Sequence, residues 1–145
     1  MCCSEKERNI MLKSLGRVCL SGIFIIAGSE AFRAPGPRTQ MVEGAGIPQP
    51  ETAVKVNGAT MVIGGAMLAL GIMPKVAAGA LIGSMIPTTL VGHAFWEEKD
   101  PKALSMQRVQ FLKNLGLVGG LLWMLAEASE EKRAKNHVEI EPLPV

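Results

Sequence analysis

The chain has 145 residues and a formal net charge of +2, with 48% hydrophobic residues, 16 glycines and only 19% charged residues. This composition leaves too little polar surface for a small soluble domain, and a weak, scattered positive charge argues against a nucleic-acid-binding protein. About 20 helical residues cross the hydrocarbon core of a bilayer, so four crossings would use about 80 residues. The sequence therefore predicts one all-α integral membrane domain, with the plasma membrane as its location.

The first apolar segment covers residues 15–32 and follows a polar N-terminal tail at residues 1–14. Its centre carries no charge, which is typical of a membrane-spanning helix. A cleaved signal peptide is an alternative, because basic residues precede the apolar run, but this run is longer than a usual signal-peptide core. Arg17 lies at the tail-side end of the segment. We expect it to be a topology anchor whose charged head reaches the interface.

Three further apolar segments follow. Residues 33–52 are rich in proline and glycine, which predicts a loop. The second span, at residues 53–73, meets Gly71 and Pro74 at its end, so the third span, at residues 76–96, is predicted to return as a tight antiparallel hairpin. Pro87 is expected to kink the third span.

A charged linker leads to the fourth span at residues 108–126, which precedes a polar C-terminal tail at residues 128–145. The prediction is an up-and-down four-helix bundle over residues 15–127. Small residues four apart predict close helix packing in this bundle. These pairs are Gly65 with Ala69, Gly79 with Gly83, and Gly116 with Gly120.

Up-and-down threading brings polar residues from all four spans to one layer, on the side away from the tails. Charged groups are costly inside a membrane, so we expect these side chains to face the bundle interior and to find partners there. Glu30 is predicted to pair with Lys113 or with a protonated His93. The candidates for a ligand or proton pocket are Glu30, Asn57, Thr60, Thr89, His93, Trp96, Lys113 and Asn114.

Simpler interpretations of these residues stay open. Trp96 at a span end is typical of an interfacial belt, and His93 could be a hydrogen-bonded packing residue. Asn57, Asn114, Thr88 and Thr89 could join helices without contacting a ligand. No catalytic residue is assigned, and no metal site is predicted, because the three cysteines form no CxxC pair and the methionines show no clustered spacing with histidine.

Three segments of the chain resemble the DoxX family of small membrane proteins. They are GRVCLSGIFIIAGSEAF from Gly16, NGATMVIGGAMLALGIMPKVAAGALIGSMIPTTLVGHAFWEEKDP from Asn57, and QFLKNLGLVGGLLWML from Gln110. The resemblance implies four transmembrane helices, in agreement with the spans counted above. The chain departs from the family pattern at Glu30 and Ala31, where many members have a lysine after the first-helix glycine. The family motif positions that match are Arg17, Gly28, Asn57, Gly65, Gly71, His93, Trp96 and Asn114.

The resemblance also implies a function, because the family takes its name from a small subunit associated with a quinone-linked sulfur-compound oxidoreductase. A subunit of such a membrane complex, with quinone as a possible ligand, is the first hypothesis, and whether the chain is itself an enzyme stays open. The second hypothesis is a non-catalytic assembly or stress-response partner, acting as a homo-oligomer or with another membrane protein. A small proton-coupled exporter is disfavoured because Glu30 lies near a span end. The positive-inside rule favours cytoplasmic tails.

Overall fold

The computed structural model describes residues 2–140, with side chains for Glu5 and residues 7–130. All regular secondary structure in this part of the chain is helical. Among these residues, four helices are long and apolar enough to cross a membrane, over Glu7–Arg33, Pro50–Leu70, Pro74–Glu97 and Pro101–Glu130. The predicted all-α, up-and-down bundle is therefore confirmed. Its elements are α1 (Cys2–Arg33), α2 (Gly36–Gly44), α3 (Pro50–Leu70), α4 (Pro74–Gly92), the short 3-10 helix η1 (Phe95–Glu97) and α5 (Pro101–Ile140).

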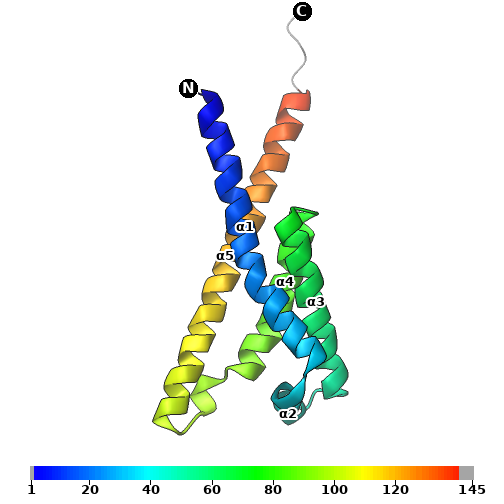
Figure 1. The fold of residues 1–145 in the computed structure, drawn as a ribbon, viewed down its shortest axis with the longest axis vertical. Coiled ribbons are helices and arrows are strands. Elements are labelled where there is room, and N and C mark those ends of the chain that lie inside the picture. Colours follow the sequence, from blue (N-terminus) through cyan, green and yellow to red (C-terminus); the bar gives the residue numbers. More distant parts are fainter. Residues whose placement is uncertain (1, 141–145) are drawn as a thin grey trace, which may run out of the picture.

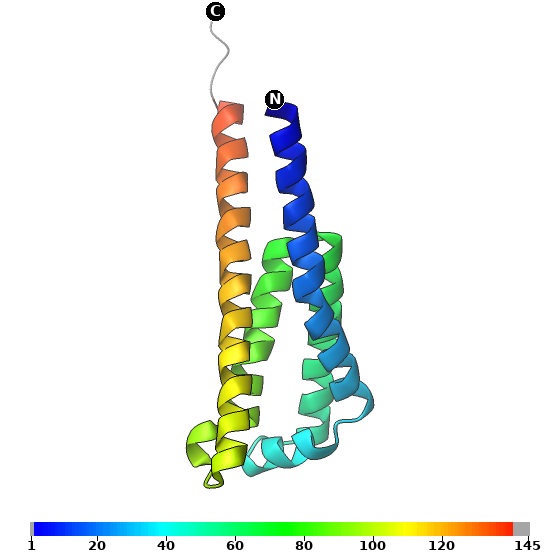
Figure 2. The ribbon, with the colours of Figure 1, turned by 60° about the vertical axis from the view of Figure 1, so that its left-hand side comes forward.

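The start of α1 and the end of α5 lie at one end of the molecule, while α2 and η1 lie at the other (Figures 1 and 2). Helix α1 packs along α3, α3 along α4, and α4 along α5. Helices α1 and α5 cross in Figure 1, where the Leu20 side chain is 3.8 Å from the position that a Cβ at Gly120 would take. Beyond this crossing, on the tail side, the Lys13 Nζ lies 3.0 Å from Oε1 of Glu127.

The core lies in the middle of the bundle, where the four long helices each contribute a buried side chain. Phe24 of α1 is 1% exposed, and Leu68 of α3, Leu81 of α4 and Leu121 of α5 are fully buried. They belong to one cluster with Ala77 and Ala78. In a bilayer these side chains gain their stabilisation from close packing, because lipid tails are as apolar as the core itself.

Glycines bring α1 and α3 into direct backbone contact. A Cβ added at Gly28 would lie 2.7 Å from the Gly58 carbonyl oxygen, and one at Gly58 would lie 2.7 Å from the Gly28 carbonyl oxygen. Gly65 also faces α1, because a Cβ added there would lie 2.9 Å from a side-chain carbon of Ile25. Real Cβ atoms do not approach other atoms this closely, so only glycine permits this helix crossing.

Other glycines do not behave as the spacing predicted. Gly79 and Gly83 of α4 and Gly116 of α5 are exposed, and a Cβ at any of them would meet nothing within 4 Å. The prediction of close packing through these three is wrong within the chain. Gly79 and Gly116 lie on the outer faces of their helices, and Gly83 borders a cavity, because α4 turns Leu81 and Ser84 toward α3 instead.

The turn between α3 and α4 is local and well determined. Gly71 ends α3 with a φ of 68°, and the N–H of Ile72 donates to the carbonyl oxygen of Met67 over 2.9 Å. This is the Schellman arrangement, which favours glycine at the left-handed position. Pro74 then opens α4, where its missing N–H has no cost. The predicted tight hairpin is confirmed.

The structure differs from the predicted helix bounds at several places, and α5 begins at Pro101 rather than at residue 108. The proline-rich segment 33–52 contains α2, which tolerates Pro37 in its first turn because the first N–H groups of a helix need no helical partner. Helix α4 ends at Gly92 rather than at residue 96. Helices α1 and α5 continue into the segments expected as tails, and of the C-terminal tail only residues 141–145 lie outside the described residues.

Candidate functional site

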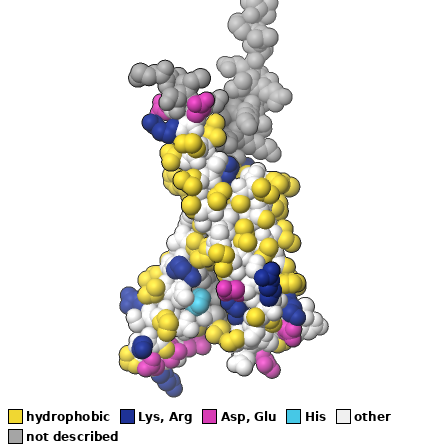
Figure 3. Space-filling view, in the orientation of Figure 1, with side chains coloured by type: hydrophobic (Ala, Val, Ile, Leu, Met, Phe, Trp, Pro, Cys, Tyr) yellow, Lys and Arg dark blue, Asp and Glu magenta, His cyan; other side chains and the backbone are white. Residues whose placement is uncertain are grey.

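A cavity of about 890 Å³ lies toward the end of the bundle that carries α2, and all five α-helices line it. Figure 3 shows a hollow on this face, with the one described histidine side chain at its edge, basic side chains on both sides and an acidic side chain on the right. Its apolar lining residues include Ile23, Phe24, Ala27, Met61, Met85 and Leu117. Its polar lining residues include Glu30, Arg38, Asn57, His93, Gln107, Lys113 and Asn114.

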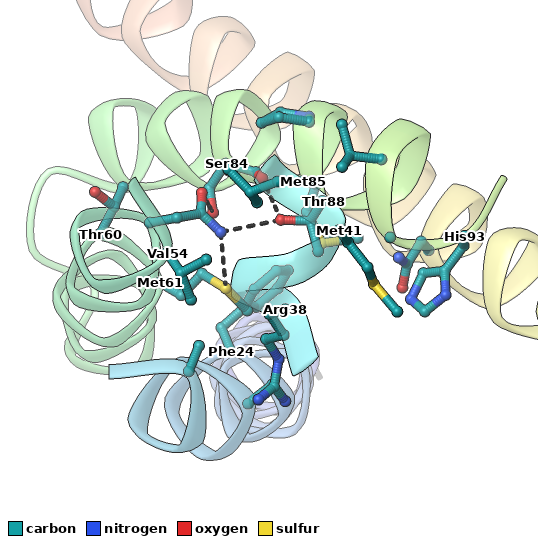
Figure 4. A pocket seen from close by; sticks show the side chains of 18 of the residues that line it. Phe24, Arg38, Met41, Val54, Thr60, Met61, Ser84, Met85, Thr88 and His93 are labelled. Atoms are coloured by element: carbon teal, nitrogen blue, oxygen red, sulfur yellow. Dashed lines mark hydrogen bonds between the residues drawn. The ribbon is translucent and has the colours of Figure 1, made fainter. Parts of the chain in front are cut away.

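Asn57 of α3 lies at the centre of a hydrogen-bond network that joins α3 to α4. Its Nδ2 donates to Thr88 Oγ1 over 3.0 Å and contacts Met61 Sδ at 3.7 Å, while its Oδ1 accepts from Ser84 Oγ over 2.9 Å (Figure 4). The Thr88 hydroxyl donates in turn to the Ser84 carbonyl oxygen. Both amide hydrogens of Asn57 are thus engaged within the protein, so its main contribution is to join the two helices.

Two polar links join α5 to α4 and to the residue that follows it. Asn114 Nδ2 donates to Thr89 Oγ1 of α4 over 3.1 Å, and Nδ1 of His93, which comes directly after the end of α4, lies 2.8 Å from Gln107 Oε1. Asn114 and Gln107 are seven residues apart and therefore lie on one face of α5. Sequence reasoning did not include Gln107 or Ser84 among the site residues, although Gln107 shares a helix face with Asn114 and Ser84 with Thr88.

The charged residues near the cavity pair differently from the expectation. Glu30 Oε2 lies 3.6 Å from Nη2 of Arg38, and both side chains are largely exposed. Neither Lys113 nor His93 comes within ion-pair distance of Glu30 in the described part of the chain. The reason is α2, which the sequence did not predict and which brings Arg38 back to the end of α1. Lys113 lines the cavity from α5.

Trp96 and Thr89 do not line the cavity. Because α4 ends at Gly92, Trp96 leaves the helix face of Thr89, stays 53% exposed and packs its edge against Phe95 and Phe111, with ring centroids 5.2 and 5.9 Å away. Thr60 does line the cavity, with its hydroxyl donating to the Val56 carbonyl oxygen of its own helix.

Arg17 lies at the opposite end of the bundle. Its Nη2 donates to Ser14 Oγ over 3.2 Å, and its guanidinium carbon is 3.6 Å from the Cβ position of Gly71, so it covers the turn between α3 and α4. Its Nε is buried without a hydrogen-bond partner among the described residues. A cation beside the carbonyl-rich C-terminus of α3 is favourably placed for the helix dipole.

Four apolar helices threaded up and down, with a cavity in the side of the bundle, define a small multi-pass membrane protein. The DoxX family model matches residues 12–94, which is more than half of the chain, so the chain belongs to the DoxX family. No curated protein sequence matches the chain at a significant level, and no solved structure does. The matched segment includes Glu30, Asn57 and His93, while α5 with Asn114 and Lys113 lies beyond it.

The structure gives physical roles to three glycines on which the family resemblance rests. Gly28 and Gly65 are positions where α1 and α3 touch, and Gly71 supplies the left-handed residue of the hairpin turn. These positions hold the bundle together and do not line the cavity.

Proposed function

We propose that this DoxX family protein binds the head group of a lipid-soluble quinone in its side cavity, as a subunit of a quinone-linked membrane oxidoreductase complex. One observation carries the proposal: a cavity of about 890 Å³ is lined by both apolar and polar side chains. This volume is in the range of about 300–1,000 Å³ that is usual for small-molecule sites. A flat apolar ring with polar edges suits such a mixed lining.

The way into the cavity supports a ligand that arrives from the lipid. Residues of both α1 and α5 line the cavity, yet the ion pair that joins these two helices in the described region, between Lys13 and Glu127, lies far away on the tail side. In Figure 3 the hollow lies between these helices. Because both helices are candidate spans, an opening between them faces apolar lipid, where a quinone is dissolved.

The polar residues would divide the work according to their contacts. His93 and Asn114 would contact the head group, with Thr89 holding Asn114 in place. Asn57 and Thr60 would form the polar floor on α3, and Trp96 would shield the outer end beside Phe95. Glu30 and Lys113, both exposed at the rim, would exchange protons between the cavity and water.

A binding titration on the purified protein in lipid nanodiscs tests the proposal, with a short-chain alkyl quinone as the probe. Ala27→Phe fills the cavity from α1 without removing a polar group and is expected to weaken binding at least about tenfold, because the ring would occupy the ligand's space. Ile26→Phe is the matched control, since Ile26 is the next residue of α1 and is 64% exposed. An equal loss of quinone affinity in both variants, or no loss in either, would count against the cavity as the binding site.

A second candidate function is a non-catalytic partner in a membrane assembly, and two outward glycines favour it. Gly79 and Gly116 have open space where a neighbouring helix could approach closely, either from a second copy or from another membrane protein. Cross-linking in native membranes tests this idea. Capture of one stable partner, lost in Gly79→Leu and kept in His93→Ala, would favour assembly over ligand binding.

A further inference from the structure

The contact between His93 and Gln107 fixes which nitrogen of the imidazole carries the proton. His93 Nδ1 lies 2.8 Å from Oε1 of Gln107, and an amide oxygen can only accept a hydrogen bond. Nδ1 must therefore be the donor. In a neutral imidazole only one nitrogen carries hydrogen, so Nε2 keeps a lone pair and is itself an acceptor.

The Nε2 atom is available to a ligand. Within the described residues Nε2 has no hydrogen-bond partner, and it is not among the buried polar atoms that lack one. His93 lines the cavity, so the free nitrogen is accessible from open space. Asn114 is less selective: its Nδ2 donates one hydrogen to Thr89, while its second amide hydrogen and its Oδ1 have no partner in that part of the chain. Asn114 can therefore donate or accept, and the acceptor-only group is Nε2 of His93.

We propose that Gln107 is a positioning residue that holds neutral His93 with Nε2 as an acceptor, so that the cavity selects a ligand head carrying a hydroxyl group over one carrying only carbonyl oxygens. This inference rests on the proposed function and specifies its ligand: the hydroquinone form binds more tightly than the quinone. A hydroxyl donates to Nε2, whereas a carbonyl oxygen would face its lone pair and leave Nε2 without a partner. Unpaired polar groups of this kind weaken binding by about tenfold or more.

The first experiment measures the tautomer without any ligand. The full chain is labelled with ¹³C and ¹⁵N at histidine and studied by NMR in nanodiscs, with His137→Gln to remove the second histidine signal. The imidazole ¹⁵N and Cδ2 shifts are expected to report hydrogen on Nδ1 in the neutral ring. Gln107→Met, which removes the acceptor at similar side-chain length, is expected to move hydrogen to Nε2, and Gln107→Glu is expected to keep it on Nδ1. Hydrogen on Nε2 in the parent chain, as the reversed Gln107 amide would give, overturns the inference.

The second experiment compares an alkyl hydroquinone with the corresponding quinone under anaerobic conditions. The parent chain is expected to bind the hydroquinone about tenfold more tightly, and Gln107→Met is expected to lose or reverse this preference. Gln110→Met is the matched control, because Gln110 lines the cavity from the same helix and, among the described residues, makes no hydrogen bond with His93. This variant is expected to keep the preference for the hydroquinone. Equal affinities in the parent chain overturn the inference. Failure of both forms to bind overturns the proposed function and the ligand class, while the tautomer result stands separately.

Discussion

Thr88 and Thr89 follow each other in the sequence but hydrogen-bond to opposite neighbours of α4. Thr88 accepts from Asn57 of α3 over 3.0 Å, and Thr89 accepts from Asn114 of α5 over 3.1 Å. Successive residues are about 100° apart around a helix, so two adjacent hydroxyls can serve two flanking helices. Helix α4 is thereby held on both sides and forms a fixed wall of the cavity. Among the described residues, no hydrogen bond joins α1 to α5 at this level, on the open side of the cavity.

The contact between Gly28 and Gly58 leads to the first prediction. Gly28→Ala and Gly58→Ala are each expected to lower the free energy of unfolding by about 1–3 kcal/mol, because the added Cβ would lie 2.7 Å from a backbone oxygen. Unfolding by SDS titration measures this loss. Gly79→Ala is the control, since its Cβ would meet nothing within 4 Å, and it is expected to leave stability unchanged or to raise it by up to about 1 kcal/mol. The opposite ranking of the variants would contradict this crossing of α1 and α3.

The Asn57 network leads to the second prediction. Asn57→Leu is expected to cost about 1–2 kcal/mol, because interhelical hydrogen bonds in membranes contribute about 0.6 kcal/mol on average and the residue makes several. Combined with Ser84→Ala, the loss should be smaller than the sum of the single losses, as measured by a double-mutant cycle. Thr60→Val is expected to be nearly neutral, since that hydroxyl bonds only to its own helix. Strict additivity of Asn57→Leu and Ser84→Ala would argue against the network.

The crossing of α1 and α5 leads to the third prediction. In a chain whose native cysteines are replaced, Lys13→Cys with Glu127→Cys should be joined by a short bifunctional thiol reagent, because these side chains form a 3.0 Å ion pair. Lys13→Cys with Lys102→Cys should not be joined, since α5 carries residue 102 near its other end. Mobility in denaturing electrophoresis distinguishes the two. Cross-linking of the second pair alone would overturn the up-and-down arrangement.

The orientation of the bundle is the subject of the fourth prediction. We propose that the tails face the cytoplasm, since basic residues are more numerous on that side. A single cysteine introduced by Glu130→Cys in the cysteine-free chain should react with a membrane-impermeant maleimide only after permeabilisation. A cysteine introduced by Lys99→Cys, at the far end of the bundle, should react in intact cells, and the reverse pattern would invert the orientation.

The sequence was sufficient for features that depend on single segments. The number of spans follows from the length of each apolar run, and the hairpin follows from Gly71 and Pro74, whose backbone preferences are local. Threading then predicted that polar residues of all four spans gather at one end, and six of the eight candidates do line one cavity there. Trp96 does not, because helix α4 stops at Gly92, a boundary that no strong local signal marks.

Only the tertiary structure decided which side chains meet. The partner of Glu30 is Arg38, because α2 folds back, and the partner of His93 is Gln107, because α4 and α5 meet along one particular pair of faces. The rotation of each helix about its own axis is set by the packing of the whole bundle, above all by the backbone contact at Gly28 and Gly58. For that reason Gly79, which has the spacing of a packing glycine, points outward and Gly83 borders the cavity, whereas Ser84 is buried against Asn57.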